Sequence, residues 1–378
     1  MGRPFEKEYL WYVARQMDSD GNRDETSFYD HLPFMGNEKY NHEAFVDSQM
    51  GDAVISLLEP FIIFDDEDGK AVKKYWERFG LKKDVHDKES AAPDWNKYSV
   101  FTPKEADEDR DRKFPCIIYV HGSRLGGTKI FCEESSGIAA MAAKYRLICA
   151  LPDNNTIDGV MRLYEKLIKD YPVDPSRIYL GGFSSGALCS VDVGFKHPEM
   201  FAGIFSLMAT PTTQEFDAEA AERAKEYGLP FIGVGGTGEM ITQFPYCEFN
   251  IKRPDEVERH KNNFYMKPEG RVQGLNAQLT ANGLKTSTLE EMRSYVSKSD
   301  KKEIKAIGVN APHSHTENIL GAEHYFAEYQ NEDGIPLVKL VAVEGLPHHP
   351  APTAYDIVWD FFQKFSRNPE TKKLVISK

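Results

Sequence analysis

The amino-acid sequence predicts an α/β fold, a mainly parallel β-sheet with helices on both of its faces. From about residue 98, short apolar or β-branched runs alternate with longer amphipathic stretches, the pattern of strands joined by crossover helices. A final amphipathic segment, Ala354 to Ser366, follows the last apolar run and would close the domain as a helix. The chain has 378 residues, of which 41% are hydrophobic, so it can fill a sizeable core.

Seven runs are interpreted as strands because they are short and rich in β-branched or apolar residues. They are Lys97 to Phe101, Cys116 to Gly122, Arg146 to Pro152, Arg177 to Gly182, Ala202 to Met208, Pro230 to Gly236 and Pro336 to Gly345. Helical patterns lie between them at Ser135 to Tyr145, Thr156 to Tyr171 and Ser184 to His197. Strands and helices therefore alternate as a parallel sheet requires.

Two segments interrupt this alternation. Residues 1–95 are rich in acidic and aromatic residues and are expected to form an N-terminal extension packed on the main domain, residues 96–378. Residues from about 240 to 330 contain charged, helix-like pieces such as Thr288 to Ile304. This second segment is expected to be an insertion or cap before the last strand of the sheet.

Composition limits the possible partners. A formal net charge of −13 argues against nucleic acid as a ligand, which would need clustered lysine and arginine. No signal peptide is apparent, and the best apolar run, Ile55 to Phe64, is interrupted by Glu59 and Pro60, so no membrane span is expected. Five cysteines without CxxC spacing fit a reduced, cytoplasmic protein. The sequence leaves open whether the protein forms a homo-oligomer.

The stretch from Gly182 to Gly186 has the pattern G-x-S-x-G, with Ser184 at its centre. A predicted strand precedes it and a predicted helix follows it, which is the setting that exposes a nucleophilic serine on a sharp turn. Ser185 does not fit the motif, because Phe183 and Ala187 stand where glycine is required. The alternative is a glycine-rich turn with a capping serine.

A serine nucleophile needs backbone N–H groups to hold the negative charge that develops on the substrate carbonyl. One such group is expected from Ser185, at the start of the helix. The other is expected from the loop after the strand that ends near His121, with Ser123 as donor and Gly122 as the alternative. His121 itself is interpreted as a hydrogen-bonding residue that shapes this loop.

These motifs give residues 98–365 a resemblance to α/β-hydrolase-fold serine esterases, the polyhydroxybutyrate depolymerase and feruloyl-esterase-like family. The segments that carry the resemblance are residues 119–123, 174–187, 235–239 and 343–350. It implies a hydrolase that cleaves a small acyl, aryl or sugar ester through an acyl-enzyme, without a cofactor. A peptidase of the prolyl-oligopeptidase type and a non-catalytic binding protein on the same scaffold are the alternatives.

In this fold the acid and the histidine follow the serine in that order. The resemblance aligns His348 with the family's histidine, in the loop between the last strand and the final helix, and His349 is the alternative. The expected acid is Glu239, where the family has aspartate. Glu248 and Asp255 are held in reserve.

Three histidines are expected to line the substrate pocket: His121, His315 and His349. His313 and His315 form an H-x-H pair, but no third metal ligand is apparent, so no metal is predicted.

Two competing patterns carry less weight. Residues Gly233 to Gly238 spell G-x-G-x-x-G, but Pro245 interrupts the helix that a dinucleotide site would need. Three acidic stretches that resemble calcium loops lack the first carboxylate and the final bidentate glutamate, and are interpreted as solvated turns.

Overall fold

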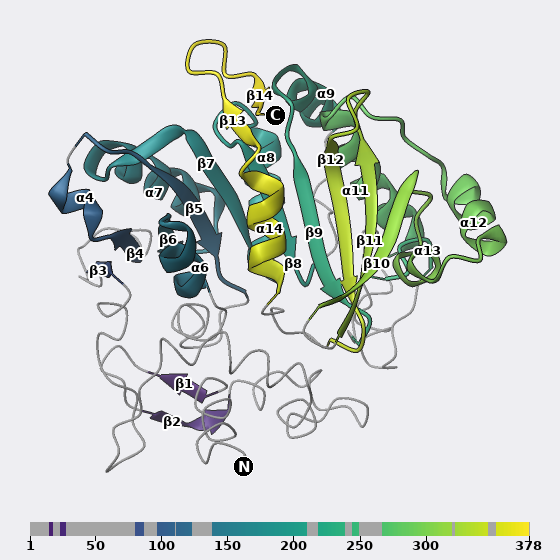
Figure 1. The fold of residues 1–378 in the computed structure, drawn as a ribbon, viewed down its shortest axis with the longest axis horizontal. Helices are drawn as coiled ribbons and strands as arrows, with labels where there is room; N and C mark the ends of the chain where they lie inside the picture. Colours follow the sequence, from purple (N-terminus) through teal and green to yellow (C-terminus); the bar gives the residue numbers. More distant parts are fainter. Residues whose placement is uncertain are drawn as a thin grey trace.

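The computed structural model describes residues 15–17, 23–27, 80–86, 97–109, 111–122, 138–209, 218–238, 244–248, 267–319, 322–346 and 353–377. One large sheet dominates these residues (Figure 1). Its 10 strands lie in the order β10-β11-β12-β9-β8-β7-β5-β6-β4-β3. In chain order they are β3 (Leu81–His86), β4 (Tyr98–Pro103), β5 (Phe114–Val120), β6 (Ile148–Pro152), β7 (Val173–Phe183), β8 (Gly203–Leu207), β9 (Phe231–Gly236), β10 (His313–Ile319), β11 (Ala322–Gln330) and β12 (Pro336–Val343).

The centre of the sheet is parallel and its two sides are antiparallel. Parallel pairing joins β6 to β5, β5 to β7, β7 to β8, β8 to β9 and β9 to β12. Antiparallel pairing adds β4 and β3 on one side, and β11 and β10 on the other. The mainly parallel α/β architecture that the sequence predicts is therefore confirmed.

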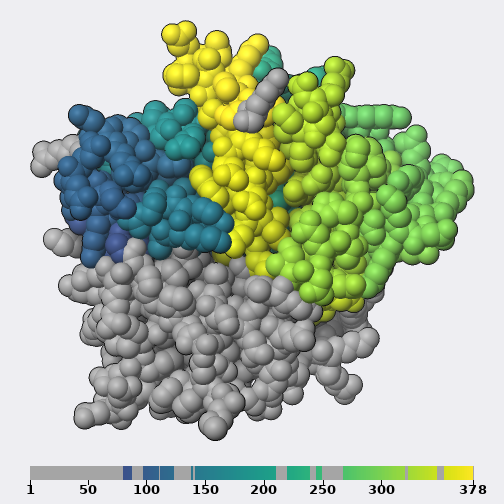
Figure 2. All heavy atoms as spheres, viewed as in Figure 1, coloured from purple at the N-terminus to yellow at the C-terminus, as the bar shows by residue number. Residues whose placement is uncertain are grey.

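Helices cover both faces of the sheet, as predicted. On one face α6 (Ile138–Tyr145) and α14 (Ala354–Phe362) pack on apolar side chains of the strands. On the other face lie α7 (Ile157–Asp170), α8 (Ser185–Lys196), α9 (Ala218–Tyr227), α11 (Pro268–Ala281) and α13 (Lys302–Ile307), which packs on β10–β12. α12 (Leu289–Lys298) packs on α11 and α13. Figure 2 shows α14 running across the middle of the first face, between the first strands of the sheet and the β10–β12 segment.

All seven predicted strands are present, as β4, β5, β6, β7, β8, β9 and β12. Three sheet strands, β3, β10 and β11, were not predicted. β11 is mostly buried, but polar residues interrupt its apolar ones. β3 and β10 have few apolar residues. In β3 only Leu81 is buried and the other residues, mostly charged, are at least partly exposed; this strand lies within the predicted N-terminal extension. The edge strand β10 is exposed along almost its whole length, and with β11 it forms a hairpin inside the predicted insertion that widens the sheet.

The remaining elements are short: α4 (Glu105–Glu108), and the antiparallel pairs β1 (Arg15–Met17) with β2 (Arg23–Ser27) and β13 (Phe365–Arg367) with β14 (Leu374–Ile376). The predicted final helix ends at Phe362, and the residues after it enter β13. Within the part of the chain that the structure describes, no helix combines the length and the apolar composition that crossing a membrane requires.

The strand order creates a switch point beside β5. From β5 the chain moves to β6 on one side, and from β7 it moves to β8 on the other. The loops that leave β5 and β7 therefore diverge to opposite faces of the sheet, with α6 on one and α8 on the other. Switch points of this kind, at the carboxyl ends of parallel strands, are where α/β proteins bind their ligands.

Candidate active site

Ser184 occupies a strained turn at this switch point, between the end of β7 and the start of α8. Its backbone has φ 56° and ψ −123°, a region that residues other than glycine rarely adopt. Neighbouring backbone groups hold it there: Ser184 N–H donates to the carbonyl oxygen of Leu207 at 2.9 Å, and Ala187 N–H donates to that of Ser184 at 3.0 Å. The half-buried serine is thus fixed at the carboxyl edge of the sheet.

The two glycines of the motif are required by close packing against the end of β5. A Cβ on Gly186 would lie 2.1 Å from the carbonyl oxygen of His121 and 2.2 Å from that of Val120. A Cβ on Gly182 would lie 2.3 Å from the same Val120 oxygen. Real Cβ atoms do not approach carbonyl oxygens so closely. The glycines therefore let the turn sit directly on the neighbouring strand, as a nucleophile elbow needs.

The loop after β5 lies against Ser184. The parallel register pairs Val120 with Gly182, so the chain two residues further on places Gly122 next to Ser184. A Cβ built on Gly122 would be 3.4 Å from the Cβ of Ser184. Gly122, one of the predicted oxyanion-hole residues, is thus adjacent to the predicted nucleophile.

Ser185 begins α8, where the first N–H groups have no partner within the helix. The backbone N–H of Ser185 is therefore suited to bind a negatively charged oxygen, which the dipole of the helix N-terminus also favours. Asn155, in the loop after β6, contacts both Ser185 and Gly122 through its side-chain amide. Ser123, the other predicted donor, lies outside the described residues.

His121 is buried and faces backbone on both sides of its ring. Nδ1 lies 2.8 Å from the carbonyl oxygen of Gly122, and Nε2 lies 2.9 Å from that of Asp153. Both ring nitrogens are thus directed at backbone carbonyl oxygens of the loops after β5 and β6, and neither is directed at Ser184. The contacts join the loops after β5 and β6, so the structure places His121 in the wall of the site and not in the position of a base.

The loops after β9 and β12, which precede the predicted acid and histidine, are bonded to one another. Thr237 N–H donates to the carbonyl oxygen of Val343 at 3.0 Å, and Gly238 N–H donates to that of Leu346 at 3.1 Å. In the other direction, Gly345 N–H donates to Thr237 Oγ1 at 2.8 Å. Both loops leave the same edge of the sheet as the Ser184 turn, because β7, β9 and β12 are parallel.

Four of the predicted residues lie outside the described residues: Glu239, Asp255, His348 and His349. Glu248, a reserve candidate for the acid, is described. Its carboxylate lies 3.3 Å from Arg293 Nε of α12 and is half exposed. Glu248 therefore forms an ion pair with an arginine of α12.

His315 is not brought to Ser184. It lies on the edge strand β10, five strands from β7 and hence about 24 Å away at the usual strand spacing. Its ring stacks on Phe326 at 4.5 Å, and its Nε2 is 3.2 Å from Glu317. His313 lies on the same strand.

The glycines of the G-x-G-x-x-G pattern have a packing role. A Cβ on Gly236 would lie 1.8 Å from the carbonyl oxygen of Leu346, and one on Gly238 would lie 2.5 Å from that of Gly345. The pattern thus brings the loop after β9 against the loop after β12. In the described part of the chain, no group of three or more histidine, cysteine, aspartate or glutamate residues could hold a metal ion.

His324, on β11, is not among the residues predicted from the sequence. It is fully buried on β11, directly opposite Val343 of β12, and its Nε2 is 2.6 Å from Thr353 Oγ1 at the start of α14. Burial lowers its pKa below the usual value. The buried pair joins β11 to the start of α14. No local signal marks His324, because its partner is 29 residues away.

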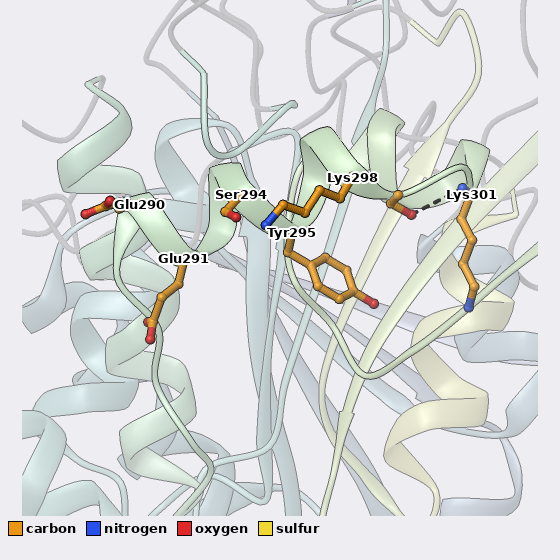
Figure 3. Close-up of a pocket in the computed structure, with 7 residues that line it drawn as sticks. Glu290, Glu291, Ser294, Tyr295, Lys298 and Lys301 are labelled. Carbon is orange, nitrogen blue, oxygen red and sulfur yellow. Dashed lines mark hydrogen bonds between the residues drawn. The ribbon is translucent and has the colours of Figure 1, made fainter.

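A separate open groove lies on α12 and the residues that follow it (Figure 3). Figure 3 shows the carboxylates of Glu290 and Glu291 at one end and Lys301 at the other, with the Tyr295 ring below the helix. These mixed charges are typical of a solvated helix surface. The groove contains none of the predicted site residues.

Comparisons with known proteins give partial similarities. No model of a protein family matches the chain. Acyl-protein thioesterase 1 of Aspergillus fumigatus is 31% identical over 106 residues, which span 26% of this chain and 44% of the thioesterase. A thermostable esterase is similar over 81% of this chain and 71% of its own, with 15% identity and a TM-score of 0.42. Acetyl xylan esterase from Aspergillus awamori is similar over 75% of this chain and 98% of its own, with 12% identity and a TM-score of 0.42.

The chain thus matches less than half the length of the thioesterase.

Proposed function

We propose that the protein is a serine hydrolase that cleaves carboxylic esters through an acyl-enzyme intermediate. The observation that carries the proposal is the strained backbone of Ser184, at φ 56° and ψ −123°, in a turn between a parallel strand and a helix. Strain at a residue that other backbone groups hold in place is concentrated at functional sites. A capping serine would need no such strain, and Ser184 makes no side-chain capping bond to α8.

In the proposed reaction, Ser184 Oγ attacks the ester carbonyl carbon while His348 removes the hydroxyl proton. The carbonyl oxygen becomes negative and is held by the backbone N–H groups of Ser185 and of Ser123 or Gly122. The intermediate collapses as the C–O bond breaks, and the alcohol leaves with the proton from His348. Glu239 holds the imidazole in the required tautomer. Water then attacks the acyl group by the same steps and frees Ser184.

The hydrogen bonds between the loops after β9 and β12 support this assignment of acid and base. Glu239 is the residue after Gly238, and His348 is the second residue after Leu346. Gly238 and Leu346 are joined by a backbone hydrogen bond of 3.1 Å. The segments that lead to the two proposed partners are therefore hydrogen-bonded to each other.

A small soluble ester with an acyl, aryl or sugar group is the proposed substrate class. The test is a panel of p-nitrophenyl, feruloyl and sugar acetate esters, with an S-acyl substrate included because of the partial thioesterase match. Amide substrates in the same panel test the peptidase alternative. Turnover should be lost in Ser184→Ala and kept in Ser297→Ala, which removes an exposed hydroxyl on α12. Equal turnover in the two variants would refute the proposal.

A further inference from the structure

We propose that Asn155 is a positioning residue that holds the two donors of the oxyanion hole at a fixed separation. Asn155 lies in the loop between β6 and α7 and is half-buried. Its Nδ2 donates to the carbonyl oxygen of Gly122 at 3.3 Å and to Ser185 Oγ at 3.2 Å. A side-chain amide has two N–H groups, so it can make both bonds at once. The inference rests on the proposed function.

The bond to Gly122 matters because of the geometry of the peptide group. A trans peptide is planar and carries its N–H opposite to its C=O. Whatever fixes the carbonyl of Gly122 therefore also fixes the direction of the amide that follows it, which is the predicted donor of Ser123. The same oxygen also lies 2.8 Å from Nδ1 of His121, which donates to it in the tautomer that carries the proton on Nδ1.

The bond to Ser185 connects this peptide to the other predicted donor. Ser185 supplies the first amide of α8, and its side chain is the acceptor that Asn155 reaches. One amide group thus links the loop after β5, the loop after β6 and the start of α8. A donor displaced from the oxyanion loses much of its effect, because stabilisation of this kind depends on preorganised distances of about 3 Å.

The loop that carries Asn155 is held at its junction with α7. Thr156 Oγ1, in the residue after Asn155, accepts the N–H of Gly159 and caps α7. At the other end of the loop, the carbonyl oxygen of Asp153 lies 2.9 Å from His121 Nε2. A neutral imidazole has one N–H, so His121 donates either to Asp153 or to Gly122. The cap on α7 fixes the neighbour of Asn155 in either case.

The test compares Asn155→Ala and Asn155→Asp with the wild type. Asn155→Asp keeps the shape of the side chain and removes both donors. Removing a whole oxyanion-hole donor costs about 100-fold to 1000-fold in kcat, so loss of a positioning residue should cost less, about 30-fold in Asn155→Ala, with KM nearly unchanged. Asn155→Asp should lose at least as much, because its negative charge opposes the oxyanion.

A second measurement separates positioning from general stability. A boronic acid forms a tetrahedral adduct with an active serine and should lose affinity in Asn155→Ala in parallel with kcat/KM. The matched control is Asn276→Ala, because Asn276 also bridges two segments, bonding the backbone of Ser287 at 2.8 Å, but lies on α11. This control should keep both kcat and boronate affinity.

A double-mutant cycle with Ser185→Ala tests the bridge itself. That variant keeps the backbone N–H and removes the acceptor Oγ, so its effect should not add to that of Asn155→Ala. The inference is overturned if both Asn155 variants keep kcat within threefold of the wild type while Ser184→Ala abolishes turnover, or if boronate affinity does not change. Turnover that survives in Ser184→Ala would instead refute the proposed function.

Discussion

Gly345 donates its backbone N–H to Thr237 Oγ1 at 2.8 Å, which joins the loop after β12 to the loop after β9. These loops lead to the predicted histidine and the predicted acid. The bond is reinforced by the backbone hydrogen bond from Gly238 to Leu346. Two loops from separate strands are therefore bonded into one unit, at the same edge of the sheet as the turn that carries Ser184.

Replacing Thr237 by valine should weaken this unit. Valine has nearly the same shape but lacks the acceptor oxygen, so the variant should lose about 1 kcal/mol of stability. We expect kcat to fall about tenfold, because the acid and the histidine would lose their alignment. Thr237→Ser keeps the oxygen and is the control. Ester turnover and urea unfolding measure both effects, and equal kcat in the two variants would show that the bond has no catalytic role.

Replacing Gly186 by alanine should disrupt the turn at Ser184. The added Cβ would lie 2.1 Å from the carbonyl oxygen of His121, so the backbone must move. We expect a loss of about 3 kcal/mol in stability, at the upper end for overpacking, and at least 100-fold in kcat. Gly283→Ala is the control, because φ there is +67° but no atom lies within 4 Å.

The control should cost about 1 kcal/mol from backbone strain and leave kcat unchanged. Urea unfolding and ester turnover of the two variants give the comparison. Full activity in Gly186→Ala would mean that the packing of the turn on β5 is not needed for function.

The buried His324 should make stability depend on pH. Burial lowers its pKa in the folded protein, while Glu317 on the neighbouring strand acts in the opposite direction more weakly. The unfolded chain therefore binds the proton more readily, and stability falls as pH decreases through about 6.5 toward the folded pKa. The loss from this one group can reach about 1.4 kcal/mol per pH unit.

The variant His324→Gln removes the titrating group. Urea unfolding at pH 7.5, 6.5 and 5.5 should show the stability advantage of the wild type over this variant shrinking as pH falls, by at most about 1.4 kcal/mol per pH unit. A constant difference across the three pH values would contradict the assignment.

Arg367 should be essential for stability and irrelevant to chemistry. Its buried guanidinium donates to the carbonyl oxygens of Phe201, Tyr227 and Gly228, and burial lowers its pKa to about 10. Lysine cannot reach all of these acceptors, so Arg367→Lys should lose about 3 kcal/mol. Arg293→Lys, at a half-exposed ion pair with Glu248, should lose less than about 0.5 kcal/mol.

Unfolding in urea measures this difference, and turnover per folded molecule should stay at the wild-type level in both variants. Equal stability of the two variants would show that the carbonyl cluster does not depend on the guanidinium.

The sequence predicts the central sheet well because its strands are apolar on both faces. It does not predict β3 and β10, whose exposed positions carry charged and polar side chains. Such residues are normal at sheet edges, where they oppose unwanted strand pairing. A search for apolar runs therefore predicts the central strands of a sheet but not its edge strands.

The candidate site also has one part that the sequence predicts and another that it does not. The turn at Ser184 is predictable because glycine at two fixed positions is a local requirement of its backbone. Asn155 and His324 are not predictable, because each acts on residues that are 29 or more positions away in the chain. Their contacts follow from the order of strands in the sheet, which no short motif encodes.

The most direct test of Ser184 as the nucleophile is covalent labelling with a fluorophosphonate, followed by mass spectrometry of the modified peptide. We expect one adduct, on Ser184, at a rate that competes with ester hydrolysis, and a fall in turnover of about 10⁶-fold in Ser184→Ala. An adduct on another serine, or a native protein that is not labelled at all, would contradict the account.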